Sequence, residues 1–218
     1  MSKTVSQVVL GSRSPQRLNL LRDIIGEDSL EVRPARSSEE VGFDGLSEWA
    51  AIEDRQLEIS RTKFEDVASQ VANRDESPII VTADTIIVVT DASGSLRVLG
   101  QPPTSDEWDQ VVRDWFLQYY FGRDHWAMTT ICAGPNQDDM QIRVVKSKVR
   151  FNADGEPWLD WYLATGEPRG KAGGYAIQGI GSLFVSSVEG SISNVVGLPI
   201  RETVELLDEL NVPLRRAA

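Results

Sequence analysis

The sequence predicts an α/β fold with a mixed β-sheet, on three observations. Short apolar runs typical of strands alternate along the chain with segments whose apolar residues recur at helical spacing. The run IIVTADTIIVV, residues 79–89, is rich in β-branched side chains, which is typical of a central strand. A turn and a second strand at 96–99 follow it directly, so we expect antiparallel as well as parallel neighbours in the sheet.

The N-terminal elements follow the order strand, turn, helix. Residues 5–10 form a short apolar strand, and Ser14 followed by Pro15 supplies an N-cap and a first-turn proline. Apolar residues then recur at helical spacing as far as Ile25. A second, longer helix with apolar faces is predicted over residues 47–72.

After the central strand, a helix capped by Thr104 carries a largely aromatic stripe between Trp108 and Tyr119. We interpret this stripe as packing rather than as a ligand site, because its spacing is what a core-facing helix requires. The remaining predicted elements are strands at 126–133 and 141–151, a short helix at 156–165 ending at Gly166, glycine loops alternating with short strands, and a closing helix at 200–210.

The composition is that of a globular protein with an acidic surface. The 218 residues, 41% hydrophobic and 25% charged, suffice for one domain or two closely joined lobes. The net charge of -11 argues against a non-specific binder of nucleic acid or of anionic membranes, since such binding needs a broad basic surface. The first 22 residues nevertheless carry basic side chains and no acid, which leaves open a local site for a small anion.

Cysteine content and hydropathy indicate a cytoplasmic protein. Cys132 is the only cysteine, so neither an intrachain disulfide nor a Cys-based zinc site can form. No apolar signal region follows Lys3, and the apolar run at 79–89 is interrupted by Asp84 and too short to span a bilayer. We therefore expect no membrane association and no export.

The stretch GSRSPQR, residues 11–17, could bind a phosphate. Free N–H groups and the dipole at a helix start attract anions, and the hydroxyls of Ser12 and Ser14 and the charge of Arg17 would add to this attraction. The alternative is a plain helix cap with surface arginines.

Asp84 is the strongest single candidate for a functional residue. An ionised carboxylate in a strand of Ile and Val is costly unless a metal, a cation or hydrogen bonds compensate. The alternative is an aspartate at a strand end that caps a turn. Glu39 and Glu40, which follow another predicted strand, could place a carboxylate beside Asp84 to share a magnesium-type cation, or could be surface charges; spacing does not decide.

The stretch GKAGGYAIQGIG, residues 170–181, concentrates glycines around Lys171 and Gln178, which allows a backbone to approach a ligand closely but also describes tight turns. It is not a P-loop, because Ala172 stands where Ser or Thr should bind the metal, and it is not a dinucleotide fingerprint. His125 is the only histidine, and we interpret it as a structural group rather than as part of a catalytic triad.

Taken together, LGSRSPQRLNLL near the start, ADT at 83–85, and GEPRGKAGGYAIQGIGSLFVSSVEGSISNVVGLPI at 166–200 resemble the Maf family of nucleoside triphosphate pyrophosphatases. The intervening stretches ISRTKF, which contains Lys63, VLGQPP at 98–103 and FGRDH at 121–125 resemble the family too. The order and the distances of these motifs fit, so the resemblance covers nearly the whole chain.

The resemblance implies one Maf-like domain over residues 1–218, with an elongated mixed sheet flanked by helices in two lobes around a central cleft, similar to inosine triphosphate pyrophosphatases. It implies that a nucleoside triphosphate is cleaved between its α- and β-phosphates, giving the monophosphate and pyrophosphate, with a divalent metal such as Mg, Mn or Co. A homodimer is the oligomeric state that the resemblance suggests.

The resemblance also assigns roles to residues. Asp84 would activate water or bind the metal, and Glu39 would be the second acidic metal ligand. The residues that would meet the phosphates are Ser12, Arg17, Lys63 and Lys171.

Four further positions bear on substrate choice. Thr85 and Gln178 match the family branch that prefers dTTP and UTP, in which Gln178 could hydrogen-bond a base edge. Gln16 stands where the family usually has the first of two arginines, and Gln101 stands where lysine is common. Losing two cations could slow turnover or shift the preferred base.

These departures keep other functions open. One alternative is a catalytically weak nucleotide-binding regulator of cell division, in line with the family's link to septum formation. Another is a protein-interaction domain that retains only the scaffold.

Overall fold

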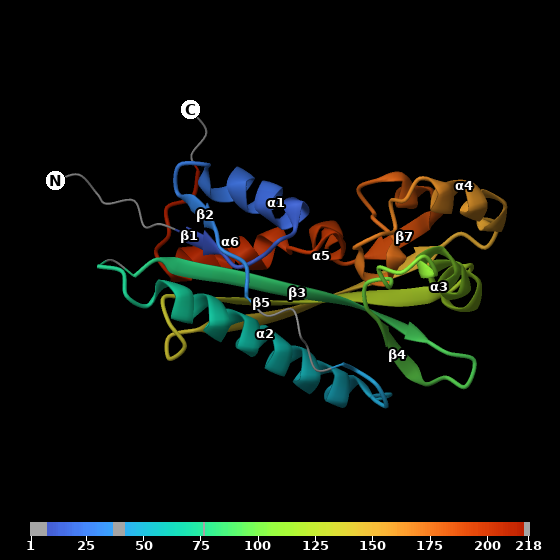
Figure 1. The fold of residues 1–218 in the computed structure, drawn as a ribbon, viewed down its shortest axis with the longest axis horizontal. Helices are drawn as coiled ribbons and strands as arrows, with labels where there is room; N and C mark the ends of the chain where they lie inside the picture. The colour runs from blue at the N-terminus through green and yellow to red at the C-terminus, as the bar shows by residue number, and fades with distance from the viewer. Residues whose placement is uncertain (1–7, 37–41, 76, 216–218) are drawn as a thin grey trace.

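The computed structural model describes residues 8–36, 42–75 and 77–215, which form a seven-stranded mixed sheet flanked by helices (Figure 1). The strand order is β2-β1-β3-β5-β6-β7, and β4 pairs with β3 beside this path. The predicted α/β class and mixed sheet are confirmed. The strands are β1 (Val8–Leu10), β2 (Leu30–Val32), β3 (Ile79–Thr90), β4 (Leu96–Leu99), β5 (Asp124–Gly134), β6 (Gln141–Phe151) and β7 (Val185–Glu189).

Helices cover both faces of the sheet (Figure 1). The α-helices are α1 (Pro15–Ile25), α2 (Trp49–Val71), α3 (Trp108–Trp115), α4 (Leu159–Ala164), α5 (Ile192–Val196) and α6 (Ile200–Glu209). A π-helical turn, η1 (Phe116–Tyr120), continues α3, and three short 3-10 turns complete the set: η2 (Glu156–Trp158), η3 (Ala172–Gly174) and η4 (Ile180–Phe184). Within the described ranges, none of the helices combines the length and the apolarity that a membrane span requires.

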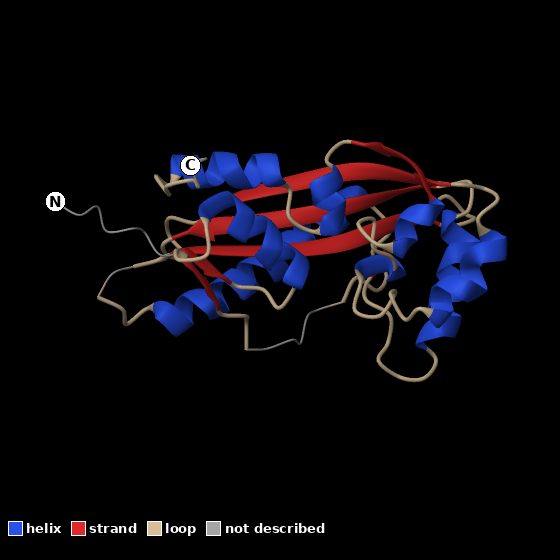
Figure 2. Ribbon diagram, turned by 90° about the horizontal axis from the view of Figure 1, so that it is seen from above, coloured by secondary structure: helices blue, strands red, loops and turns tan. Residues whose placement is uncertain are grey.

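Alternating strand residues build two cores on opposite faces of the sheet. Leu10 and Val81 pack with α1 and α6, whereas Val9 and Ile80 pack with Phe64 and other residues of α2. Figure 2 shows the longest strands running side by side along the length of the molecule. The sheet is therefore elongated, and its two faces are buried by different helices.

The central strand β3 is paired unequally on its two edges. On one edge β5 pairs with it from Ile80 to Val88 without interruption. On the other edge the parallel strand β1 ends opposite Val81, and the antiparallel strand β4 pairs only with residues from Ile87 to Thr90. Residues 82–86 consequently have no strand partner on this edge among the described segments. We call this gap in the sheet the β3 notch.

The chain leaves β1 for α1 at the β3 notch, as the strand-turn-helix prediction requires. Ser14 is the N-cap, its Oγ accepts the N–H of Arg17 at 3.4 Å, and Pro15 occupies the first turn. Gly11 is needed here because a Cβ atom would stand 2.6 Å from the side chain of Thr82. The turn therefore passes directly against β3.

The far end of the sheet carries an aromatic core. Phe116, Tyr120, Phe151 and Phe184 are fully buried or nearly so. The predicted packing role of the α3 stripe is confirmed for its buried members, whereas Trp115 and Tyr119 are partly buried and also line the cleft described below. His125 is fully buried among these rings, with Nε2 2.9 Å from the Tyr175 hydroxyl. This position agrees with its interpretation as a structural group.

Two local predictions were wrong. Thr104 does not cap α3, because residues 105–107 form a separate turn and the helix begins at Trp108. After β6, the described residues contain one strand, β7, where several were expected, together with 3-10 turns and α5. The helix α5 has only 5 residues, too few to show a period, and its local signal is the Ser191 side chain that caps the Asn194 N–H at 3.2 Å.

The buried imidazole predicts a pH dependence of stability. Burial lowers the pKa of His125 to about 3, whereas the unfolded chain titrates near about 6.5. The folded state excludes this proton, so the stability contributed by His125 is complete above the unfolded pKa and is lost as the pH falls toward the folded one. Between pH 7 and pH 5 the loss from this one residue should be about 2 kcal/mol.

Urea unfolding of the wild type and of His125→Phe at pH 7 and pH 5 measures this term, and His125 is the only histidine in the chain. The wild type should lose about 2 kcal/mol more than the variant on acidification. Equal losses in both proteins would contradict the assignment.

Candidate functional site

The β3 notch opens into a cleft of ≈ 1230 Å³. Its walls are the turn that begins α1, the middle of β3, part of α2, β4 and the glycine-rich segment after α4. The structure brings together in this cleft the predicted site residues Ser12, Gln16, Arg17, Lys63, Asp84, Thr85, Lys171 and Gln178. Glu39 and Glu40 lie outside the described residues. Of the basic residues near the N-terminus, Arg13 and Arg17 line the cleft.

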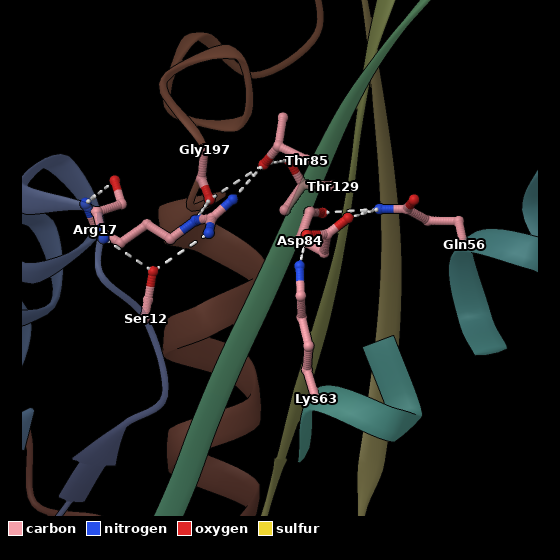
Figure 3. Close-up of polar contacts among 9 residues, drawn as sticks. Ser12, Arg17, Gln56, Lys63, Asp84, Thr85, Thr129 and Gly197 are labelled. Atoms are coloured by element: carbon pink, nitrogen blue, oxygen red, sulfur yellow. Dashed lines mark hydrogen bonds and ion pairs between the residues drawn. The ribbon is translucent and has the colours of Figure 1, made fainter. Parts of the chain in front are cut away.

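Asp84 and Thr85 reach the same cleft from opposite faces of β3. Successive strand residues point to opposite sides of a sheet, and here the unpaired edge exposes both sides to one space. Figure 3 shows Arg17 approaching β3 from α1, and Gln56 and Lys63 approaching from α2. The site therefore consists of two polar groups joined across the open edge of one strand.

The first group holds the Asp84 carboxylate. Asp84 is 9% exposed. Lys63 Nζ forms an ion pair with Oδ1, and Gln56 Nε2 donates to Oδ2 at 2.9 Å and to the Asp84 carbonyl at 3.0 Å. Both carboxylate oxygens are thus compensated by donors. The alternative of a strand-end cap is wrong, because Asp84 lies in the middle of β3.

The sequence reasoning missed Gln56. This side chain is fully buried on the stripe of α2 that also contains Ile52 and Ile59, and its Oε1 has no hydrogen-bond partner among the described residues. An amide at an apolar position of a helix must find polar partners. That mismatch is the signal that could have identified Gln56.

The second group is organised by Arg17. Its Nε donates to the Gly197 carbonyl at 2.8 Å, one terminal nitrogen to Ser12 Oγ at 3.2 Å, and the other to Thr85 Oγ1 at 2.9 Å. Thr85 Oγ1 also lies 2.9 Å from Thr129 Oγ1. Arg17 consequently ties the start of α1, the β3 notch and the segment after α5 together (Figure 3).

The glycine-rich segment forms a further wall and is anchored on the aromatic core. The Tyr120 hydroxyl donates to the Gly173 carbonyl at 2.8 Å, and the Tyr162 hydroxyl donates to the Gly174 carbonyl at 3.3 Å. Burial raises the pKa of Tyr120 well above its usual value, so its hydroxyl stays protonated and can donate. Lys171 lines the cleft from this anchored segment.

The substitutions of basic residues also fall in the cleft. Gln16 and Gln101 both line it, and Gln16 Oε1 accepts a hydrogen bond from Ser14 Oγ at 3.1 Å. Arg97, which the sequence reasoning missed, lines the cleft from β4 and pairs with Asp91 at 2.9 Å. The described part of the cleft therefore mixes positive and negative side chains.

The donor set limits how a divalent cation could be held. Within the described residues there is no group of three or more His, Cys, Asp or Glu side chains arranged to bind a metal. Magnesium-type ions are often held by one or two carboxylates together with substrate phosphates. The described residues fit a cation shared between Asp84 and a bound phosphate, and do not fit one held by protein side chains alone.

The fold is that of an α/β protein with a mixed sheet, and the open edge of its central strand forms one wall of a large polar cleft. Sequence comparison identifies the family. The profile of the family described as Maf-like protein matches residues 7–210, and the chain belongs to this family. The family resemblance recognised from the motifs is thereby confirmed.

Curated relatives cover nearly the whole chain. A protein from Anaeromyxobacter sp. (strain Fw109-5), named dTTP/UTP pyrophosphatase, is 37% identical over 95% of this chain and 91% of its own length. Relatives with the same name from Bradyrhizobium diazoefficiens and Rhodopseudomonas palustris (strain HaA2) are 36% and 35% identical, over 95% and 96% of this chain and 92% and 94% of their own lengths.

A solved structure of a nucleoside-triphosphatase (dITP/XTP pyrophosphatase) from Mycobacterium abscessus is 14% identical, with a TM-score of 0.34 over 67% of this chain and 75% of that one. Similarity at this level adds nothing to the family assignment.

The contact between Gln56 and Asp84 predicts a stability effect. Gln56→Leu leaves a buried carboxylate oxygen without its donor, so the free energy of unfolding should fall by about 1–3 kcal/mol. Gln110→Leu is the matched control, because the Gln110 side chain is exposed on α3 and, among the described residues, its amide bonds the half-buried Asp114 alone; its effect should stay within about 0.5 kcal/mol. Urea unfolding at pH 7 measures both, and equal effects would show that the buried amide contributes nothing.

Proposed function

We propose that this protein is a nucleoside triphosphate pyrophosphatase that acts on dTTP and UTP, or on modified pyrimidine nucleotides. The observation that carries the proposal is the gathering of one buried carboxylate, several cations and a helix start in the cleft at the β3 notch. The names of relatives that cover nearly the whole chain support the same activity.

The phosphates bind between α1 and the glycine-rich segment. The N–H groups at the start of α1 and the Ser12 hydroxyl donate to phosphate oxygens, and Lys171 neutralises charge from the opposite wall. Arg17 holds Ser12 in place and adds its charge at the same helix start. This arrangement supplies positioning and charge neutralisation, which are the main requirements of phosphoryl-type cleavage.

Asp84 orients the attacking water and accepts its proton. Lys63 forms an ion pair with one carboxylate oxygen, and Gln56 fixes the orientation of the second oxygen. The water oxygen bonds to the α-phosphorus, the bond from that phosphorus to the α,β-bridging oxygen breaks, and pyrophosphate leaves with the electron pair. A divalent cation, when bound between Asp84 and the phosphates with Glu39 as the proposed second ligand, would supply further charge neutralisation.

Gln178 recognises the base in this proposal. Its side chain is exposed and lines the cleft, where its amide can pair with the carbonyl and N–H edge of thymine or uracil. Thr85 contributes differently, because its hydroxyl accepts from Arg17 and contacts Thr129. Thr85 therefore supports the arginine clamp rather than the base.

A nucleotide screen with Mg²⁺, Mn²⁺ or Co²⁺ tests the function. We expect dTTP and UTP to be cleaved faster than the other triphosphates, with monophosphate and pyrophosphate released in equal amounts. Release of orthophosphate would contradict cleavage between the α- and β-phosphates. Nucleotide binding without turnover across the whole panel would instead favour the catalytically weak regulator.

Replacing Asp84 tests the mechanism. Asp84→Asn removes the proton acceptor but keeps the shape, so kcat should fall by about 100-fold or more while the protein stays folded. Asp44→Asn is the matched control, because Asp44 is an exposed acid that lines the same cleft, and its kcat should remain near the wild-type value. Undiminished pyrophosphate release by Asp84→Asn would reject the role assigned to Asp84.

A further inference from the structure

A carboxylate outside the cleft holds the turn that carries Gln178. The two oxygens of Glu167 accept the consecutive N–H groups of Ile180 and Gly181, each at 2.7 Å. The same turn is closed by the Gly179 N–H, which donates to the Ala176 carbonyl at 3.1 Å. Two short bonds to one carboxylate are charge-assisted and fix both distance and orientation.

The residue between Gln178 and Ile180 must be glycine for this contact to form. A Cβ atom on Gly179 would overlap the Glu167 carboxylate. The space that a side chain would occupy is thus filled by the carboxylate itself. A side chain at position 179 and the Glu167 carboxylate therefore cannot occupy this space together.

Glu167 is in turn fixed to the aromatic end of the protein. Its own N–H donates to Thr165 Oγ1 at 3.1 Å, directly after α4. Burial, with the nearby charge of Glu167, raises the pKa of Tyr162, whose hydroxyl donates to the Gly174 carbonyl. Glu167 therefore connects the end of α4 to the turn.

The side chain of Gln178 has no comparable support. It is exposed in the cleft, and no described side chain forms a hydrogen bond with its amide. Its place is set by the backbone of the turn alone. Glu167 does not line the cleft, so it can act only by way of this backbone.

We propose that Glu167 is a positioning residue for pyrimidine selectivity: it fixes the 176–181 turn so that the Gln178 amide meets the base, without touching the substrate itself. This inference rests on the proposed function, in which Gln178 recognises the base.

The test compares kcat/KM for dTTP with that for dCTP. Glu167→Gln keeps the size but turns an NH₂ group toward one of the two N–H donors, so the turn is released. The dTTP preference should fall about tenfold, mainly by a rise in KM for dTTP. Gly179→Ala disturbs the same contact from the other side, so it should cause the same loss.

Two further variants separate positioning from general damage. Glu156→Gln removes an exposed carboxylate at η2, before α4, and should keep the wild-type preference. Gln178→Leu should lose the preference by itself, and adding Glu167→Gln to it should cause no further loss, because both changes act through one side chain. Circular dichroism and thermal unfolding confirm that each variant is folded.

The outcomes distinguish this inference from the proposed function. If the wild type and both turn variants prefer dTTP equally while Gln178→Leu does not, the role of Glu167 is overturned and the proposed function stands. An additive loss in the double variant also overturns it. A wild type that cleaves no triphosphate removes the proposed function, and the role of Glu167 with it.

Discussion

The unequal pairing of β3 is the constraint on which the site depends. A strand interior normally has both edges hydrogen-bonded, and buried backbone groups left without partners are costly. Along residues 82–86 one edge of β3 lacks a strand partner among the described segments, and this edge faces the cleft. Because that edge is open, two consecutive side chains that point to opposite faces can serve one cleft.

The cations in the cleft are placed by local contacts, although the protein as a whole is acidic. The chain carries a net charge of -11, which repels a polyanion at long range. Lys63 and Arg17 are held at the notch by contacts with Asp84 and Thr85, so their positions are set before a ligand arrives. Preorganised cations of this kind lose little on binding, and they stabilise charge that develops during reaction.

Local signals in the sequence were sufficient to predict the central strand and the Ser14 cap. They also singled out Asp84, because an acid in an apolar strand is unusual wherever it occurs. The family motifs located the cleft residues through the order of distant segments. Gln56 and Glu167 were not found, since each acts through a contact that only the folded chain creates: one reaches β3 from α2, and the other reaches a turn after a separate 3-10 segment. Helix α5 is too short to show a period.

Under the proposed function, the neutral side chains of Gln16 and Gln101 change which groups in the cleft attract the substrate. Gln16 bonds Ser14 within the first turn of α1, so the helix start remains intact although a charge is missing. Arg17 already meets three protein acceptors, so in the proposed function the attraction for phosphates rests more on Lys63, Lys171 and the backbone N–H groups. If the proposed function holds, weaker phosphate binding makes base contacts a larger share of the total binding free energy, because selectivity is a difference in binding between competing ligands. A turn held rigidly by a carboxylate is the kind of support that such a site requires.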